Sequence, residues 1–174
     1  MSGQDGSSPA SHLTEEEVLC LIDIVEEFDP VVVGGQAVNL WVQFFRGGRP
    51  GFLGDRAFTS KDIDFYRNQE AAERLADELG GQVFVPRPGD ATPNAAVVVG
   101  KLGERTITVD FMATVLGVEG RRVTNNQVMI EARSPLTNRP IRILLLHPLD
   151  CLRSRLANIN TLKRHDAHSV DHWL

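Results

Sequence analysis

The spacing of apolar residues near the start of the chain predicts a capped helix. Thr14 and Glu17 have the spacing of a capping box, in which each side chain accepts a hydrogen bond from the other residue's backbone N–H. Apolar residues then recur every three or four positions, which is the period of one helix face. The pattern predicts a helix over about 14–28, ended by Asp29 and Pro30.

A strand, a glycine turn and a second helix are expected next. Three consecutive valines, 31–33, are typical of a short buried strand, and this run stops at Gly34 and Gly35. The following stretch AVNLWVQFF, 37–45, has the length of a helix and ends before a glycine-rich loop. The paired glycines therefore lie where a strand passes into a helix.

The remainder of the chain continues to alternate between helical and extended patterns, with a proline-rich loop over 86–93. We expect a strand at KDIDF (61–65), a helix at 69–81, a strand near 82–85, a hairpin of strands 95–100 and 105–112 around KLGE, strands near 127–132 and 139–146, and closing helices at 148–159 and 162–173. The predicted fold class is α/β (α+β), with a mixed sheet flanked by helices.

Length and composition indicate one globular domain. The chain has 174 residues, of which 42% are hydrophobic, enough for a sizeable core. We expect a flexible tail over 1–12 and a single domain over 13–174. Because the apolar runs are far shorter than the roughly 20 residues that span a bilayer, we expect a soluble, cytoplasmic protein that does not enter a membrane. Cys20 and Cys151 lie in apolar stretches, which favours reduced core thiols over a disulfide.

The charge of the chain bears on its partners. A net charge of -5 argues against a general nucleic-acid binder, because such proteins usually carry a basic surface. Arginines nevertheless gather at Arg46, Arg49 and Arg56, at Arg121 and Arg122, and at Arg153 and Arg155. Solvated surface charge is the commoner meaning of such groups, and a local phosphate-binding patch is the alternative.

Two aspartates share one face of a strand that otherwise looks buried. In the segment TSKDIDFY, Asp62 and Asp64 alternate with Ile63 and Phe65, so the carboxylates lie on one face and the apolar side chains on the other. Like charges side by side destabilise a strand. The pattern therefore requires a nearby cation or exposure to solvent.

A third aspartate belongs to the second strand of the expected hairpin. Asp110 shares a face with Thr106 and Thr108, while the intervening apolar residues share the opposite face. Taken singly, each aspartate is explained by turn capping, by backbone hydrogen bonds or by an arginine partner. Three aspartates on two strands, after a strand that ends in two glycines, are much harder to explain as accidents.

These segments together resemble a known family. The order VVVGGQAVNLW, KDIDF, TVDFM resembles the nucleotidyltransferase superfamily of the DNA polymerase beta type, over roughly residues 30 to 160. Within the superfamily, the chain is most similar to AbiEii-type toxins and related minimal proteins of toxin–antitoxin systems. The similarity lies in the motifs GGQA and TSKDIDF and in the segment HPLDCLRSRLANI, which opens a helix. The resemblance implies a small sheet of about four or five strands, with the acidic strands at its centre.

The resemblance also implies a reaction and its ligands. It implies transfer of a nucleotidyl group from a nucleoside triphosphate to a hydroxyl of tRNA, protein or a small molecule, with Mg²⁺ or Mn²⁺ as cofactor and an antitoxin as partner. Asp62 and Asp64 would hold the metal that carries the triphosphate, and Asp110 would bind the catalytic metal and help deprotonate the acceptor. Carboxylates suit Mg²⁺ because this ion prefers oxygen ligands.

Further residues are implied to bind the nucleotide. Gly34 and Gly35 would let backbone N–H groups at a helix start approach a phosphate, and a plain strand-to-helix turn is the alternative. Gln36 and Lys61 are candidates beside them. Many members of the superfamily carry serine where this chain has Gly35, and toxins often carry lysine where it has Arg155, which can contact phosphate but cannot act as a general base.

Other side chains carry weaker signals. His165, His168 and His172 have a spacing that could gather a transition metal, although exposed histidines near a terminus are commoner. Trp41 and Trp173 are interpreted as core anchors, with base stacking as the alternative. At the level of function, the alternative to an enzyme is a nucleotidyltransferase-fold module that has lost turnover and works as a binding or regulatory partner.

Overall fold

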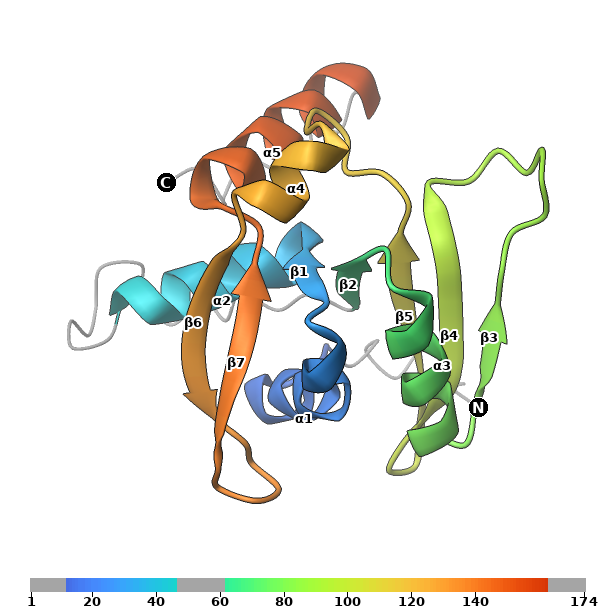
Figure 1. Ribbon diagram of the computed structural model, residues 1–174, viewed down its shortest axis with the longest axis vertical. Helices are drawn as coiled ribbons and strands as arrows, with labels where there is room; N and C mark the ends of the chain where they lie inside the picture. The colour runs from blue at the N-terminus through green and yellow to red at the C-terminus, as the bar shows by residue number, and fades with distance from the viewer. Residues whose placement is uncertain (1–11, 47–61, 163–174) are drawn as a thin grey trace, which may run out of the picture.

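A computed structural model describes residues 12–46 and 62–162, which form a mixed α/β fold (Figure 1). The helices are α1 (Glu15–Val25), the 3-10 helix η1 (Glu26–Phe28), α2 (Gly34–Arg46), α3 (Gln69–Glu78), α4 (Gly120–Asn125) and α5 (Pro148–Leu162). The strands are β1 (Val31–Val33), β2 (Ile63–Tyr66), β3 (Gln82–Phe84), β4 (Asn94–Leu102), β5 (Arg105–Met112), β6 (Val128–Arg133) and β7 (Pro140–Leu145). The predicted fold class is confirmed.

The strands form one mixed sheet in the order β3-β4-β5-β2-β1-β7-β6. β2 pairs with β5 and β1 with β7 in parallel, and the other neighbours are antiparallel. The sheet has seven strands, so the number implied by the family resemblance is too small. The central position of the acidic strands β2 and β5 agrees with the expectation.

Several element boundaries differ from those expected from the sequence. The expected helix over 14–28 tightens into η1 for its last turn, after a capping box in which Thr14 N donates to Glu17 Oε2 at 2.7 Å. The hairpin turn between β4 and β5 is shorter than KLGE, because Leu102 pairs with Arg105 and Gly103 has a φ of +62°. That positive φ suits a tight two-residue turn.

Two helices depart further from the sequence pattern. α2 begins at Gly34 itself, three residues before the expected start, so both glycines belong to its first turn. The six-residue helix α4 was not expected, since GRRVTN contains a single buried apolar residue, Val123, and has no helical periodicity. The expected helix over 162–173 and most of the expected tail over 1–12 lie outside the described residues.

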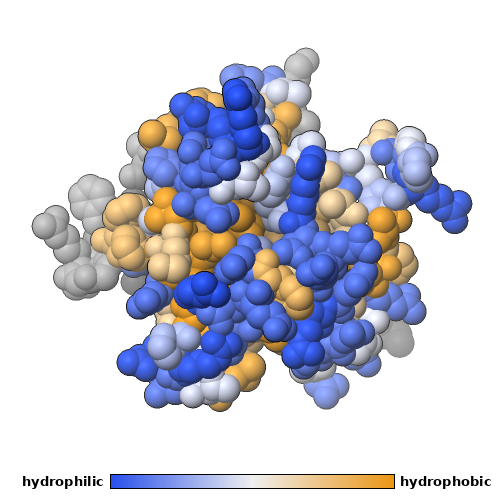
Figure 2. Space-filling model, viewed as in Figure 1, coloured by the Kyte–Doolittle hydropathy of each residue, from blue (hydrophilic) through white to orange (hydrophobic). Residues whose placement is uncertain are grey.

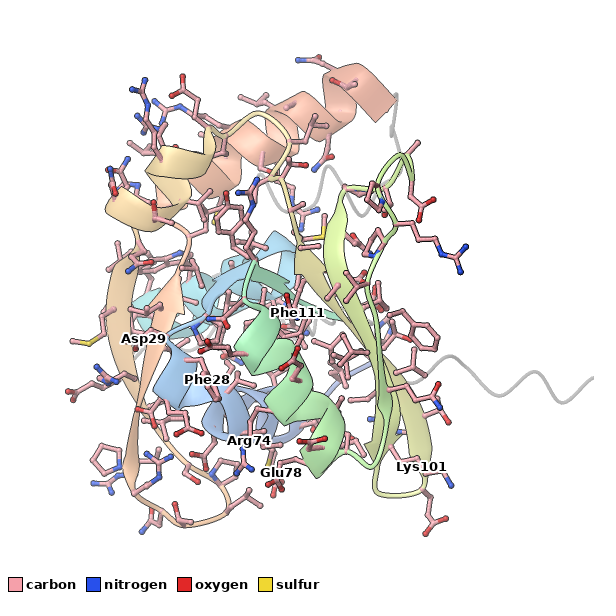
Figure 3. The ribbon with its side chains drawn as sticks, turned by 45° about the vertical axis from the view of Figure 1, so that its right-hand side comes forward. Phe28, Asp29, Arg74, Glu78, Lys101 and Phe111 are labelled. Carbon is pink, nitrogen blue, oxygen red and sulfur yellow. The ribbon has the colours of Figure 1, made fainter. Side chains whose placement is uncertain are left out.

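The apolar face of the two acidic strands lies in the core. Ile63, Phe65 and Phe111 are fully buried, and the rings of Phe65 and Phe111 stack with centroids 5.3 Å apart. Figure 3 shows Phe111 within the body of the molecule, whereas Arg74 and Glu78, an exposed ion pair of α3, lie below it in this view. Since the buried apolar residues form one continuous cluster, the acidic strands have little freedom to shift.

The helices α2 and α5 pack at the end of the sheet where the acidic residues lie. α2 contacts β1, β2 and α5, and Trp41 Nε1 on α2 donates to the carbonyl of Leu146 at 2.8 Å, as expected for a core anchor. α4 and α5 lie together at one end of the molecule, beyond the ends of β5 and β7 (Figure 1). α5 therefore covers the end of the sheet to which β1 and β5 lead.

The surface is mixed in polarity. Figure 2 shows a largely hydrophilic face with a smaller area of apolar side chains near its middle. Cys151 is buried and Cys20 is half-buried, and both are free thiols, as the sequence predicts. None of the helices in the described part of the chain has the length and apolar character needed to cross a membrane.

Candidate active site

Six of the predicted site residues line one cavity of about 660 Å³ between the sheet and α5. Its lining comes from seven places: the end of β1, the first turn of α2, β2 with the residue before it, the start of β4 with the residue before it, the end of β5, the loop after β5, and the middle of α5. The residues that line it are Val33, Gly34, Gly35, Asp62, Asp64, Pro93, Asn94, Asp110, Met112, Thr114, Val115, Leu116, Ser154, Arg155 and Asn158.

Strand register brings two of the aspartates side by side. β2 and β5 are parallel, and Asp64 pairs directly with Asp110. Neighbouring strands lie about 4.8 Å apart, so partners in register are adjacent on the same face. Asp62 is exposed and precedes β2 by one residue, which by strand alternation places it on that face as well. The structure therefore gathers all three carboxylates at the cavity, as predicted.

Burial and neighbouring carboxylates raise the pKa values of Asp64 and Asp110. The pKa of Asp64 rises from 3.8 to about 7, first because of burial and then because of the charges of Asp110 and Asp62, which outweigh the opposing effect of Arg155. Burial and the charge of Asp62 also raise the pKa of Asp110, against a hydrogen bond from Asn94. The site thus holds more negative charge than its surroundings compensate.

A buried aspartate elsewhere in the chain shows what a structural carboxylate looks like here. Asp150 on α5 is completely buried, yet it accepts hydrogen bonds from Arg122 at 3.1 Å and from Arg153 at 2.6 Å. Burial would raise its pKa, but hydrogen bonds from Arg153 and Arg122 lower it below the usual value. Asp64 and Asp110 show the opposite shift, which distinguishes them from a carboxylate that serves the fold.

Gly34 is required because Asp64 lies against its backbone. Val33 pairs with Asp64 across β1 and β2, so the next residue, Gly34, sits over the carboxylate. A Cβ added at Gly34 would overlap Oδ2 of Asp64, and the φ of +65° is one that side chains rarely adopt. The glycine therefore allows the Asp64 carboxylate to lie against the backbone, and the phosphate approach expected from the sequence stays a prediction.

The remaining nucleotide-binding candidates divide into three cases. Arg155 lines the cavity from α5 and is partly buried. Gln36 is buried, accepts a hydrogen bond from Asn39 at 3.0 Å, and is not among the residues that line the cavity. Lys61 lies outside the described residues, as do His165, His168, His172 and Trp173.

The carboxylate oxygens of the three aspartates are the kind of ligand that a hard cation such as Mg²⁺ prefers, and their negative charges lie close together in the cavity. In residues 12–46 and 62–162, no three acidic, histidine or cysteine side chains are placed closely enough to hold one metal ion together. Asp64 and Asp110 would be the residues nearest to such an ion, because they are paired in register.

Some cavity residues were missed in the sequence. Ser154 and Asn158 lie on either side of Arg155, and their i, i+4 spacing places them on one face of α5. That spacing could have been found beside Arg155. Asn94 lies between the expected loop and the expected strand, and its Nδ2 donates to Asp110 Oδ1 at 3.1 Å.

Comparison with known proteins adds no relative: searches of protein-family models, curated proteins and solved structures return no match to this chain.

Proposed function

We propose that the chain is a nucleotidyltransferase that uses Mg²⁺ or Mn²⁺ and a nucleoside triphosphate. The observation that carries the proposal is the register pairing of Asp64 with Asp110 in one cavity with Asp62, opposite the first turn of α2 and Arg155. A structural role would leave such carboxylates compensated by cations, as Asp150 is. Recruitment of divalent cations explains why this chain tolerates uncompensated charge at a cavity.

The residues of the cavity fit the steps of such a transfer. Gly34 and Gly35, at the start of α2, line the cavity, and the dipole at a helix start favours phosphate. Arg155 supplies positive charge from the opposite wall. A divalent cation bound at the carboxylates would neutralise the triphosphate and the departing pyrophosphate.

Proton transfer is assigned to Asp110. In the proposed step, the acceptor hydroxyl oxygen forms a bond to the α-phosphorus as the bond to the β-phosphate oxygen breaks, and pyrophosphate leaves. The hydroxyl proton passes to Asp110, whose raised pKa makes it a better base than an ordinary aspartate. The acceptor class stays open among tRNA, protein and small molecules, and an antitoxin partner is part of the same hypothesis.

The position of the transferred label tests the reaction class. With Mg²⁺, a cell extract and each nucleoside triphosphate, we expect α-³²P to enter an acceptor and γ-³²P to be released, because only the nucleotidyl group is retained. Fractionation into RNA, protein and small molecules identifies the acceptor. Transfer of γ-³²P would indicate a kinase instead, and no transfer of either label with any nucleotide would support the non-catalytic binding module.

A further inference from the structure

A bulge in β4 turns the side chain of Asn94 toward the acidic cavity. Ala96 pairs with Phe111, and regular pairing would then place Ala95 opposite Met112. Instead Asn94 pairs with Met112, so one extra residue is inserted in β4. Such bulges re-aim side chains and occur next to active sites. Without the inserted residue, strand alternation would direct Asn94 to the opposite, apolar face of the sheet.

The peptide group between Pro93 and Asn94 is held by two hydrogen bonds. Its own N–H donates to Thr92 Oγ1 at 3.2 Å, and the carbonyl of Pro93 accepts from Ala113 N at 2.7 Å. Pro93 and Asn94 thus connect the start of β4 to the loop that leaves β5. A side chain on so fixed a backbone can orient a partner, because little freedom is left for it to lose.

Asn94 forms a hydrogen bond with one of the two carboxylate oxygens of Asp110. An ionised carboxylate only accepts hydrogen bonds, so the Asn94 amide must be the donor in the 3.1 Å contact with Oδ1. The bond occupies one direction around that oxygen and restricts rotation of the carboxylate. It also favours the charged form of Asp110, against burial and the charge of Asp62.

We propose that Asn94 is a positioning residue for Asp110: its amide holds Oδ1 so that Oδ2 is left for a cation or for the proton of the acceptor. This inference rests on the proposed nucleotidyl transfer. Nothing in the proposed chemistry needs Asn94 to touch the nucleotide. Its removal should therefore weaken cation binding and slow turnover, while the affinity for the nucleoside triphosphate changes little.

The contact itself can be tested without metal or substrate. In ¹H–¹⁵N spectra of the metal-free protein, Asp110→Asn should shift the Asn94 side-chain amide more than any other side-chain amide, because Asn94 loses a charged acceptor. The amide of Asn125, exposed on α4, serves as the internal reference. If the chemical shift of the Asn94 side-chain amide does not change in Asp110→Asn, the proposal is overturned.

Cation binding then tests the role. Calorimetric titration with Mn²⁺ alone should show affinity about 10- to 100-fold lower in Asn94→Ala, the usual cost of losing an orienting partner, and unchanged affinity in Asn125→Ala. Asn94→Leu, which keeps the volume, should behave like Asn94→Ala. With the labelled acceptor, kcat should fall while KM for the nucleoside triphosphate stays within about threefold.

The outcomes separate the two hypotheses. Wild-type affinity for Mn²⁺ in a folded Asn94→Ala or Asn94→Leu protein would overturn the positioning role and leave the proposed function intact. A wild-type protein that binds no Mn²⁺ at all would overturn the proposed function, and the positioning role with it.

Discussion

Asp110→Asn is expected to lower nucleotidyl transfer by about 10²- to 10⁴-fold, the range associated with loss of a general base. Binding of the nucleoside triphosphate should change little, because asparagine keeps the shape of the side chain and the carboxylates of Asp62 and Asp64, proposed to hold the triphosphate's metal, still line the cavity. Transfer of α-³²P and equilibrium binding of the same nucleotide, measured on one preparation, check the two halves of this expectation.

Two further variants make the Asp110 result specific. Asp77→Asn alters an aspartate exposed on α3, away from the cavity lining, and should transfer at the wild-type rate. Gly35→Val should instead weaken nucleotide binding, because its side chain would crowd the cavity at the first turn of α2. If Asp110→Asn loses nucleotide as completely as Gly35→Val, the separate roles assigned to these residues are wrong.

Asp64→Asn is expected to stabilise the metal-free protein at pH 8 by about 2 kcal/mol, since one pKa unit corresponds to about 1.4 kcal/mol and part of the shift is relieved by relaxation. The sign follows from the pKa, which is about 7 in the folded protein and 3.8 ordinarily. The folded state therefore holds the proton more tightly than the unfolded state. Stability from this group is present below pH 4 and is lost as the pH rises through 7.

Urea unfolding in EDTA between pH 4 and pH 8 measures this effect. Wild type should lose stability over that window, whereas Asp64→Asn should lose about 2 kcal/mol less, because its amide cannot ionise. Asp77→Asn should follow the wild-type curve. A variant at Asp64 that is less stable than wild type at pH 8 would show that this carboxylate serves the fold, since removing an acceptor of buried hydrogen bonds costs about 1 to 3 kcal/mol.

The faces of the acidic strands could be predicted from the sequence because strand alternation has a period of two. That rule separates Asp62 and Asp64 from Ile63 and Phe65, and it places Asp110 correctly as well. The pairing of Asp64 with Asp110 required more, since it depends on which strands become neighbours and in what register. The family resemblance implied that the acidic strands lie at the centre of the sheet, but neither it nor the local pattern gave their register.

Other parts of the site depend on features without a local signature. The bulge before Ala96 places Asn94 on the face of the sheet that carries Asp110. The residues Asn94, Ala95 and Ala96 contain no sequence signal that predicts an inserted residue. Gly34 looked like a phosphate-binding glycine, but its closest neighbour is Asp64, which is distant in sequence. Gln36 is adjacent to the glycines, yet the helix period turns its side chain into the interior.

Thermal melting of wild type and Asp64→Asn, each in EDTA and with Mg²⁺ or Mn²⁺ plus each nucleoside triphosphate, tests most directly whether the carboxylates form a metal–nucleotide site. At 100 times its dissociation constant, a bound ligand adds about 2.7 kcal/mol. At roughly 2 to 4 °C per kcal/mol for a chain of this size, wild type should melt about 5 to 11 °C higher with its nucleotide. Asp64→Asn should show no such increase. A wild type that melts at the same temperature with every metal–nucleotide pair would contradict the proposed site.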